Sequence, residues 1–135
     1  MLFRSRGIHP AVLTEQGLAA ALKTLAERSP VPVTIVEIPD DRLPAAVEAA
    51  AYFLVSEALA NVAKYARASR VRIRIAGDVG RVVVDVDDDG VGGADPSRGS
   101  GLCGLADRVH ALGGELTIES PPGGGTHVHA ELACG

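Results

Sequence analysis

Three side chains of complementary chemistry share one face of the longest predicted helix. Glu57, Asn61 and Lys64 follow one another at i, i+4 and i+7, a spacing that stacks them along a helix. The amide oxygen can bind a hard cation such as Mg2+, the amine can meet a phosphate oxygen, and the carboxylate can orient or deprotonate a nucleophile. The set therefore suits a metal–phosphate ligand. The alternative is a solvated helix face with a Glu–Lys pair.

An acidic run followed by glycines closes a predicted strand at residues 87–93, Asp-Asp-Asp-Gly-Val-Gly-Gly. Three adjacent carboxylates repel one another, so another interaction must offset that cost. One of them can accept a hydrogen bond from an exocyclic amine such as that of adenine, and the glycines would let a planar ring approach the backbone. The alternative is a polar turn. An EF-hand is excluded because a strand, not a helix, precedes the run.

Two further glycine-rich segments lie at residues 99–105 and 123–126. The first opens a predicted helix, where unpaired backbone N–H groups form an anion site that a polyphosphate can approach closely. It lacks the Gly-Lys-Ser/Thr ending of a Walker A loop, and no strand leads directly into it as the Rossmann fingerprint requires. A glycine-rich hinge without a ligand is the alternative for the first segment, and a hairpin turn for the second.

The elements that must position these residues follow from apolar periodicity. The order of helices and strands that this periodicity predicts favours an α/β two-layer sandwich, with helices packed on one face of a mixed β-sheet. In chain order we expect a helix opening at Thr14 and stopped by Ser29-Pro30, a strand over 31–38, a helix over about 44–66, strands over 70–75 and 82–87, a helix over 102–112, and strands over 115–119 and 126–132.

Composition narrows the classes of function. The chain has 135 residues, a net charge of −4, 47% hydrophobic and 22% charged residues, which indicates a single globular domain. The acidic balance argues against a nucleic-acid partner, and no apolar run reaches the ~18 residues of a membrane span, so no direct membrane contact is expected. The two cysteines make no disulfide framework, which predicts a reduced, cytoplasmic setting.

Together and in this order, the four segments resemble the ATP-binding catalytic domain of sensor histidine kinases. That family shares the Bergerat fold with DNA gyrase, a heat-shock chaperone ATPase and mismatch-repair ATPases. Residues 53–66 resemble the N box, and 88–92 resemble the Asp-x-Gly-x-Gly of the first glycine box. Residues 99–105 resemble the second glycine box, and 123–126 the terminal Gly-Thr motif.

The resemblance implies ATP and Mg2+ as cofactors and assigns roles to individual residues. Asn61 would bind Mg2+, Glu57 would assist phosphoryl transfer and Lys64 would contact phosphate. Asp88 would accept a hydrogen bond from the adenine amine. The remaining motif residues would complete a site for ATP or ADP, with Gly90 and Gly92 giving the ring room, Gly101, Leu102 and Gly104 holding a lid over the phosphates, and Thr126 supporting the adenine pocket.

The N-terminal residues indicate which group of sensor histidine kinases the chain resembles. Residues 8–13, with 17–22, resemble the Leu-His-Pro segment of kinases that pair with LuxR-type (NarL-like) response regulators, and such a regulator is the implied partner. Residues 1–13 would then be a leader from an upstream dimerisation domain or linker, and residues 14–135 the ATP-binding catalytic domain.

The phosphoacceptor histidine of this family lies in a dimerisation domain, where an acidic residue follows it. His9, His110, His127 and His129 are followed by Pro, Ala, Val and Ala, and none fits. We therefore expect the catalytic module of a longer kinase, with or without a membrane anchor, which transfers the γ-phosphate of ATP to a histidine on a separate domain. The alternatives are an anti-sigma-factor serine kinase of the same fold and a non-catalytic nucleotide-binding interaction module. His127 and His129 are predicted to face solvent on their strand.

Overall fold

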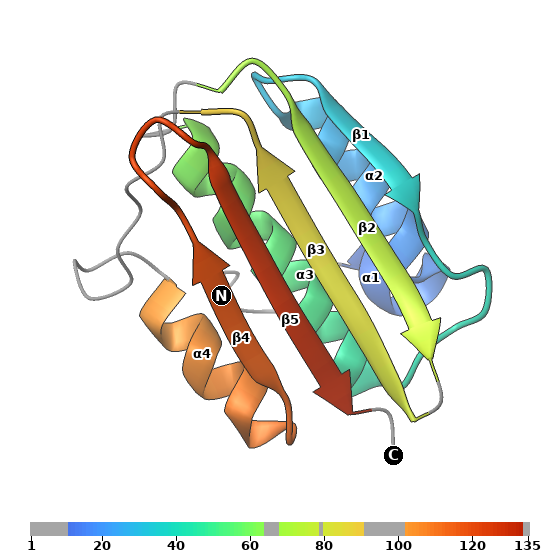
Figure 1. Cartoon of the computed structure of the whole chain (residues 1–135). Helices are drawn as coiled ribbons and strands as arrows, with labels where there is room; N and C mark the ends of the chain where they lie inside the picture. The colour runs from blue at the N-terminus through green and yellow to red at the C-terminus, as the bar shows by residue number, and fades with distance from the viewer. Residues whose placement is uncertain (1–10, 64–67, 79, 91–101, 134–135) are drawn as a thin grey trace, which may run out of the picture.

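A single five-stranded sheet organises the chain. The computed structural model describes residues 11–63, 68–78, 80–90 and 102–133. The strands are β1 (Val33–Glu37), β2 (Val71–Asp78), β3 (Arg81–Asp88), β4 (Glu115–Glu119) and β5 (Thr126–Ala133). Their order in the sheet is β1-β2-β3-β5-β4 (Figure 1). β1 runs parallel to β2 and every other neighbouring pair is antiparallel, so the sheet is mixed as predicted.

The helices cover one face of this sheet. They are α1 (Ala11–Gln16), α2 (Leu18–Arg28), α3 (Ala45–Asn61) and α4 (Leu102–Ala111). In Figure 1 α1, α2 and α3 lie behind the strands and α4 lies beside β4, and α4 packs against α3 and β4, which confirms the predicted two-layer α/β sandwich. Among the described helices, none is both long and apolar enough to cross a membrane.

The core forms where the apolar residues of the strands meet α3. Alternate residues of the three central strands are buried, and the residues between them lie on the face that carries no helix. This is the period-two pattern that the sequence predicts for strands with one buried face. The buried strand residues are Val71, Ile73, Ile75, Val82, Val84, Val86, Val128, Ala130 and Leu132.

Helix α3 carries the first candidate residues and runs through the middle of the helical layer. It follows Pro44, whose φ of −53° suits a position just before the first turn. Its α-helical part ends at Asn61, and residues 62 and 63 continue as a π-type turn. The predicted continuation to residue 66 falls on residues 64–67, outside the described part of the chain, and Lys64 lies there too.

The predicted helix start at Thr14 is wrong. The first helix begins at Ala11, includes the buried Leu13 and ends at Gln16, and Gly17 separates it from α2. Gly17 has a φ of +95°, and a Cβ there would lie 2.9 Å from the side chain of Arg42. A residue of another type would be strained in that conformation, which explains why the helical pattern divides at this glycine.

One buried carboxylate ties this junction to the start of α3. Glu48 is the buried charged residue of the described chain, at 3% exposure. It accepts hydrogen bonds from Arg42 at 3.0 and 3.1 Å and from the backbone N–H of Leu43. Burial raises the pKa of Glu48, but these hydrogen bonds outweigh it and the pKa lies below its usual value. Arg42 also reaches the carbonyl of Thr14, so one guanidinium joins α1 to α3.

Candidate functional site

A small cavity lies where the end of α3 faces the paired ends of β3 and β5. Its polar lining comes from Asn61, Asp88 and Thr126, three residues from segments far apart in the sequence. The sheet register pairs Asp88 with Thr126 directly, and α3 brings Asn61 over them. The rest of the lining is apolar and consists of Ala58, Val62, Val86 and Val128. The described part of the cavity is far smaller than a complete ligand site, but an apolar lining with a few polar groups has the composition of a small-molecule site.

Asp88 is held in place by backbone donors. Its Oδ1 accepts the N–H of Gly90 at 2.8 Å, and the backbone of Thr126 donates to the same carboxylate. Burial raises the pKa of Asp88 above its usual value, and the neighbouring charges of Asp89 and Asp87 add to the increase, against the opposing effect of the two backbone hydrogen bonds. A carboxylate has further lone pairs, so Asp88 can accept another hydrogen bond from a ligand.

The three consecutive carboxylates each have a separate partner, and these contacts offset the electrostatic repulsion expected among them. Asp87 is exposed and lies 3.7 Å from His127 on the face without helices. Asp89 accepts the backbone N–H groups of Ser69 and Arg70 at 2.8 and 3.0 Å. With a hydrogen bond from the hydroxyl of Ser69 as the largest cause, these contacts lower the pKa of Asp89 to about 2. Asp88 alone of the three lines the cavity.

The turn before β5 brings its backbone against Asp88. Gly125 has a φ of +78°, and a Cβ built on it would lie 2.2 Å from the carbonyl oxygen of Asp88. The next residue, Thr126, shares a 2.6 Å hydrogen bond between its hydroxyl and that of Ser120, where β4 ends. The terminal Gly-Thr segment therefore supports the floor of the cavity by close backbone packing and by a side-chain hydrogen bond.

The residues of α3 divide between the cavity and its surroundings. Asn61 is half-buried at the cavity edge. Glu57 is half-buried one turn earlier and is not among the lining residues. An amide oxygen is a hard ligand of the kind that Mg2+ takes together with water and phosphate oxygens. Asn61 at the cavity edge therefore offers the type of ligand that a Mg2+–nucleotide requires, and the predicted phosphate contact, Lys64, lies outside the described residues.

The second glycine segment lies largely outside the described chain. Gly92 and Gly101 fall in the range 91–101, which the structure does not describe. Leu102 begins α4, and Gly104 is exposed in its first turn, where an added Cβ would meet no atom within 4 Å. The predicted lid residues are thus not among those that line the cavity in the described part of the molecule.

Three contributors to the site are absent from the predicted set. Gly125 packs on the backbone of Asp88, Ser120 binds the hydroxyl of Thr126, and Ser69 fixes Asp89. The Gly-Gly-Gly-Thr run gives a signal for Gly125, since glycine before a strand indicates a positive φ or a close approach. No local pattern marks Ser69, because its partner Asp89 lies in another segment of the chain, and none marks Ser120, which meets Thr126 only when the turn between β4 and β5 has formed.

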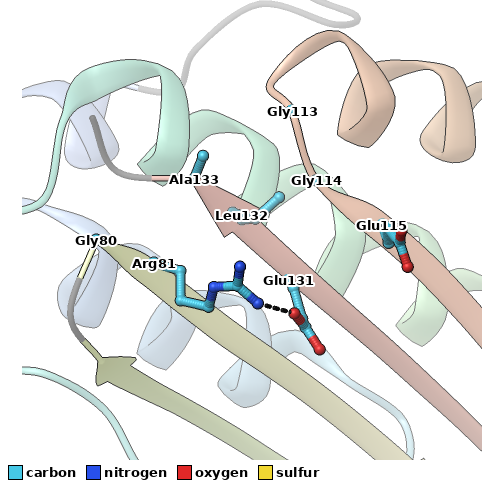
Figure 2. Close-up of a pocket in the computed structure, with 8 residues that line it drawn as sticks. All are labelled: Gly80, Arg81, Gly113, Gly114, Glu115, Glu131, Leu132 and Ala133. Atoms are coloured by element: carbon cyan, nitrogen blue, oxygen red, sulfur yellow. Dashed lines mark hydrogen bonds and ion pairs between the residues drawn. The ribbon is translucent and has the colours of Figure 1, made fainter.

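A second hollow lies at the opposite end of the sheet. Arg81 and Ala133 pair at the far end of β3 and β5 from Asp88 and Thr126. There, as Figure 2 shows, the ion pair between Arg81 and Glu131 lies beside the turn at Gly113 and Gly114. None of its lining residues belongs to the predicted site, so the cavity at Asp88 is the candidate.

Comparisons with known proteins assign the family. A family model described as histidine kinase-, DNA gyrase B-, and HSP90-like ATPase matches residues 46–134. The sensor histidine kinase NarS of Mycobacterium tuberculosis (strain ATCC 25618 / H37Rv) is 36% identical over 93% of this chain and 31% of its own length. The histidine-protein kinase/phosphatase DegS of Brevibacillus brevis is 38% identical over 65% of this chain and 24% of its own length.

A solved structure of a histidine kinase domain is similar to this chain in fold and in sequence. The histidine kinase domain of the blue-light activated histidine kinase from Erythrobacter litoralis EL346 has a TM-score of 0.68 at 28% identity, over 88% of this chain and 58% of that structure. The chain spans less than a third of either curated relative. The matched residues 46–134 include the whole lining of the cavity. The chain belongs to the histidine kinase-, DNA gyrase B- and HSP90-like ATPase family and is an ATP-binding catalytic domain of the sensor histidine kinase group.

Proposed function

We propose that this domain binds Mg2+–ATP in the cavity at Asp88 and transfers the γ-phosphate to a histidine on a separate dimerisation domain. The observation that carries the proposal is the convergence of Asn61, Asp88 and Thr126 on one cavity. The lining of this cavity combines a hydrogen-bond acceptor for a base, a hard ligand for a metal and apolar side chains. The chemistry needed is mostly positioning and charge neutralisation, because phosphoryl transfer asks little covalent work of the protein.

Each residue of the proposed site has a defined task. The carboxylate of Asp88 accepts the exocyclic amine of adenine, and the backbone at Gly90 and Gly92 leaves room for the ring. Asn61 holds Mg2+, which supplies charge neutralisation at the phosphates when bound. Glu57 orients the acceptor imidazole and takes up its proton. Lys64 contacts phosphate, and residues Gly101, Leu102 and Gly104 cover the phosphates.

The proposed reaction moves the γ-phosphoryl group from ATP to the acceptor histidine in one displacement. An imidazole nitrogen of the acceptor histidine forms a bond to the γ-phosphorus, the bond from that phosphorus to the bridging oxygen breaks, and ADP leaves. The relatives named above are sensor histidine kinases, which supports a histidine acceptor. A LuxR-type response regulator is the proposed next recipient of the phosphoryl group.

Titration with a fluorescent ATP analogue tests nucleotide and metal binding together. We expect saturable binding that ATP and ADP compete for and that Mg2+ strengthens. Asn61→Ala should remove most of the Mg2+ enhancement, weakening Mg2+–ATP by about tenfold while metal-free ATP changes little, because one oxygen ligand of the metal is lost. Equal losses with and without Mg2+ would remove Asn61 from the metal site, and no saturable binding would contradict the proposed function.

Phosphotransfer is tested with radiolabelled ATP and the dimerisation domain of the parent kinase. The chain alone should acquire no phosphohistidine, and the added domain should acquire an acid-labile phosphate. Glu57→Gln should retain nucleotide affinity and lose this transfer, because it removes the proton acceptor without altering the described lining of the cavity. Acid-stable phosphoserine formed on a protein substrate, with none on the histidine domain and with binding of a sigma factor, would instead indicate the serine kinase alternative.

A further inference from the structure

Two histidines and an aspartate converge on the sheet face that carries no helix. His127 and His129 stand at i and i+2 on β5, so both side chains lie on the same face. Asp85 on β3 is the direct register partner of His129. Its Oδ1 lies 2.8 Å from Nε2 of His127 and 2.6 Å from Nδ1 of His129. As predicted, both histidines lie on the solvent-facing side of their strand, where their side chains are 39% and 32% exposed and share one carboxylate.

The separation of these three atoms suits a metal ion. One ligand atom from each side chain lies within 4.8 Å of the others. Ligand atoms around tetrahedral zinc, with bonds of about 2.0–2.2 Å, are roughly 3.3 Å apart. Small side-chain rotations therefore convert the hydrogen-bonded cluster into a coordination set. Imidazole nitrogens with a carboxylate oxygen suit zinc and neighbouring transition metals and suit Mg2+ poorly.

The second nitrogen of each ring faces another carboxylate. Nδ1 of His127 lies 3.8 Å from Glu119, and Nε2 of His129 lies 3.4 Å from Glu131. A carboxylate behind a metal-bound imidazole fixes the ring and its tautomer and raises its basicity. This outer ring distinguishes the cluster from a chance pair of surface histidines. Asp87, 3.7 Å from Nε2 of His127, is placed to supply a fourth ligand.

The charges around the cluster also favour a cation. Its four carboxylates are those of Asp85, Asp87, Glu119 and Glu131. Arg81 pairs with Glu131. A separate hollow on this face is lined by Asp85, Asp87 and His127 together with Arg72, which the strand register places opposite Asp87. Arg74, also in that hollow, is paired with Glu37 at 2.8 Å. With neutral imidazoles, the carboxylates therefore outnumber the arginines that face them.

We propose that Asp85, His127 and His129 bind a zinc-class divalent transition-metal ion on the open face of the sheet, with Asp87 or water as the fourth ligand. This site is separate from the nucleotide cavity. His127 follows Thr126 and Asp87 precedes Asp88, and in a strand consecutive side chains point to opposite faces. A bound ion would cross-link β3 to β5 directly behind the residues that line the nucleotide site.

The test uses tag-free, nucleotide-free protein in which Cys103 and Cys134 are replaced by serine, since thiolates bind the same metals. Zn2+ binding is measured by calorimetry, and Co2+ by its visible absorption, with Zn2+ and then Mg2+ as competitors. We expect saturation at one ion per chain, displacement of Co2+ by Zn2+, and none by Mg2+.

Matched variants decide whether the binding is at this cluster. His127→Gln and His129→Gln should each weaken Zn2+ binding by more than tenfold, and Glu131→Gln, behind the ring of His129, by about tenfold. His110→Gln is the control, because His110 is exposed on α4 and lies outside the cluster. Unchanged nucleotide affinity confirms that the variants fold. Unaltered Zn2+ affinity in both histidine variants, binding that does not saturate at one ion, or displacement of Co2+ by Mg2+ would overturn the proposal.

Discussion

Asp88→Asn is expected to weaken ATP binding by about 10- to 100-fold, corresponding to about 1.5–3 kcal/mol for a hydrogen bond to a charged group. The carboxylate already accepts from the N–H of Gly90 and from the backbone of Thr126. The adenine amine would be a further donor. Asparagine has one acceptor oxygen and one donor NH2, so in either orientation a donor meets a donor. Calorimetric titration with ATP measures the loss.

Asp87→Asn is the matched control for this substitution. It removes the same charge from the adjacent residue, but Asp87 is exposed on the opposite face of the sheet and does not line the cavity. Its ATP affinity should stay close to that of the unmodified protein in metal-chelated buffer. Similar losses in the two variants would mean that net charge, not the adenine contact, causes the effect.

The pH dependence of binding provides a second measurement on Asp88. Because burial raises the pKa of this carboxyl, it takes up a proton at a higher pH than an ordinary aspartate. The ionised form is the one that accepts from the amine, so ATP affinity should fall as the pH decreases through that raised pKa. Asp88→Asn has no such proton. The ratio of the two affinities should therefore approach one at low pH, and the titration of ATP itself cancels in the ratio.

Gly125→Ala is expected to have the largest effect on both stability and nucleotide binding. The left-handed conformation costs an alanine about 1–2 kcal/mol, and forcing an extra carbon into a packed region costs about 1–3 kcal/mol more. The added Cβ would lie 2.2 Å from the carbonyl oxygen of Asp88 and 3.4 Å from Cα of Asp89. These are backbone atoms, so relief of the overlap must displace Asp88. Urea unfolding and ATP titration measure the two consequences.

Gly123→Ala separates conformational strain from the overlap. Gly123 has the same φ of +78° in the same turn, and a Cβ there would meet no atom within 4 Å. The Gly123→Ala variant should lose only the about 1–2 kcal/mol of stability that the strained conformation costs, and it should keep its ATP affinity. If Gly125→Ala and Gly123→Ala lose equal stability and bind ATP equally, the contact between the terminal Gly-Thr segment and Asp88 has no role in the site.

Much of the fold could be predicted because its signals are local. Alternating apolar residues mark β2, β3 and β5, and the buried residues of these strands are those that the alternation selects. The first helix was predicted to start at Thr14 instead of Ala11, because Thr14 has the residue type of a helix cap and the division at Gly17 involves contact with Arg42, a distant residue. Glu48 gave no signal at all, since a glutamate near a helix start is ordinarily exposed.

In the candidate site, too, some features could be predicted from the sequence and others only from the folded structure. The resemblance of the four segments to the kinase family selects Asn61, Asp88 and Thr126. The structure supplies the reason that Asp88, and not its neighbours, faces the cavity: the strand register turns Asp87 to the other face, and Ser69, from another segment, binds Asp89. The cluster at Asp85 likewise exists only once β3 pairs with β5. By itself, the sequence determined the elements, the family and the chemical inventory, since these depend on local periodicity and residue type. The tertiary structure alone decided which groups meet, because hydrogen-bond partners and ligand sets join residues that only folding brings together.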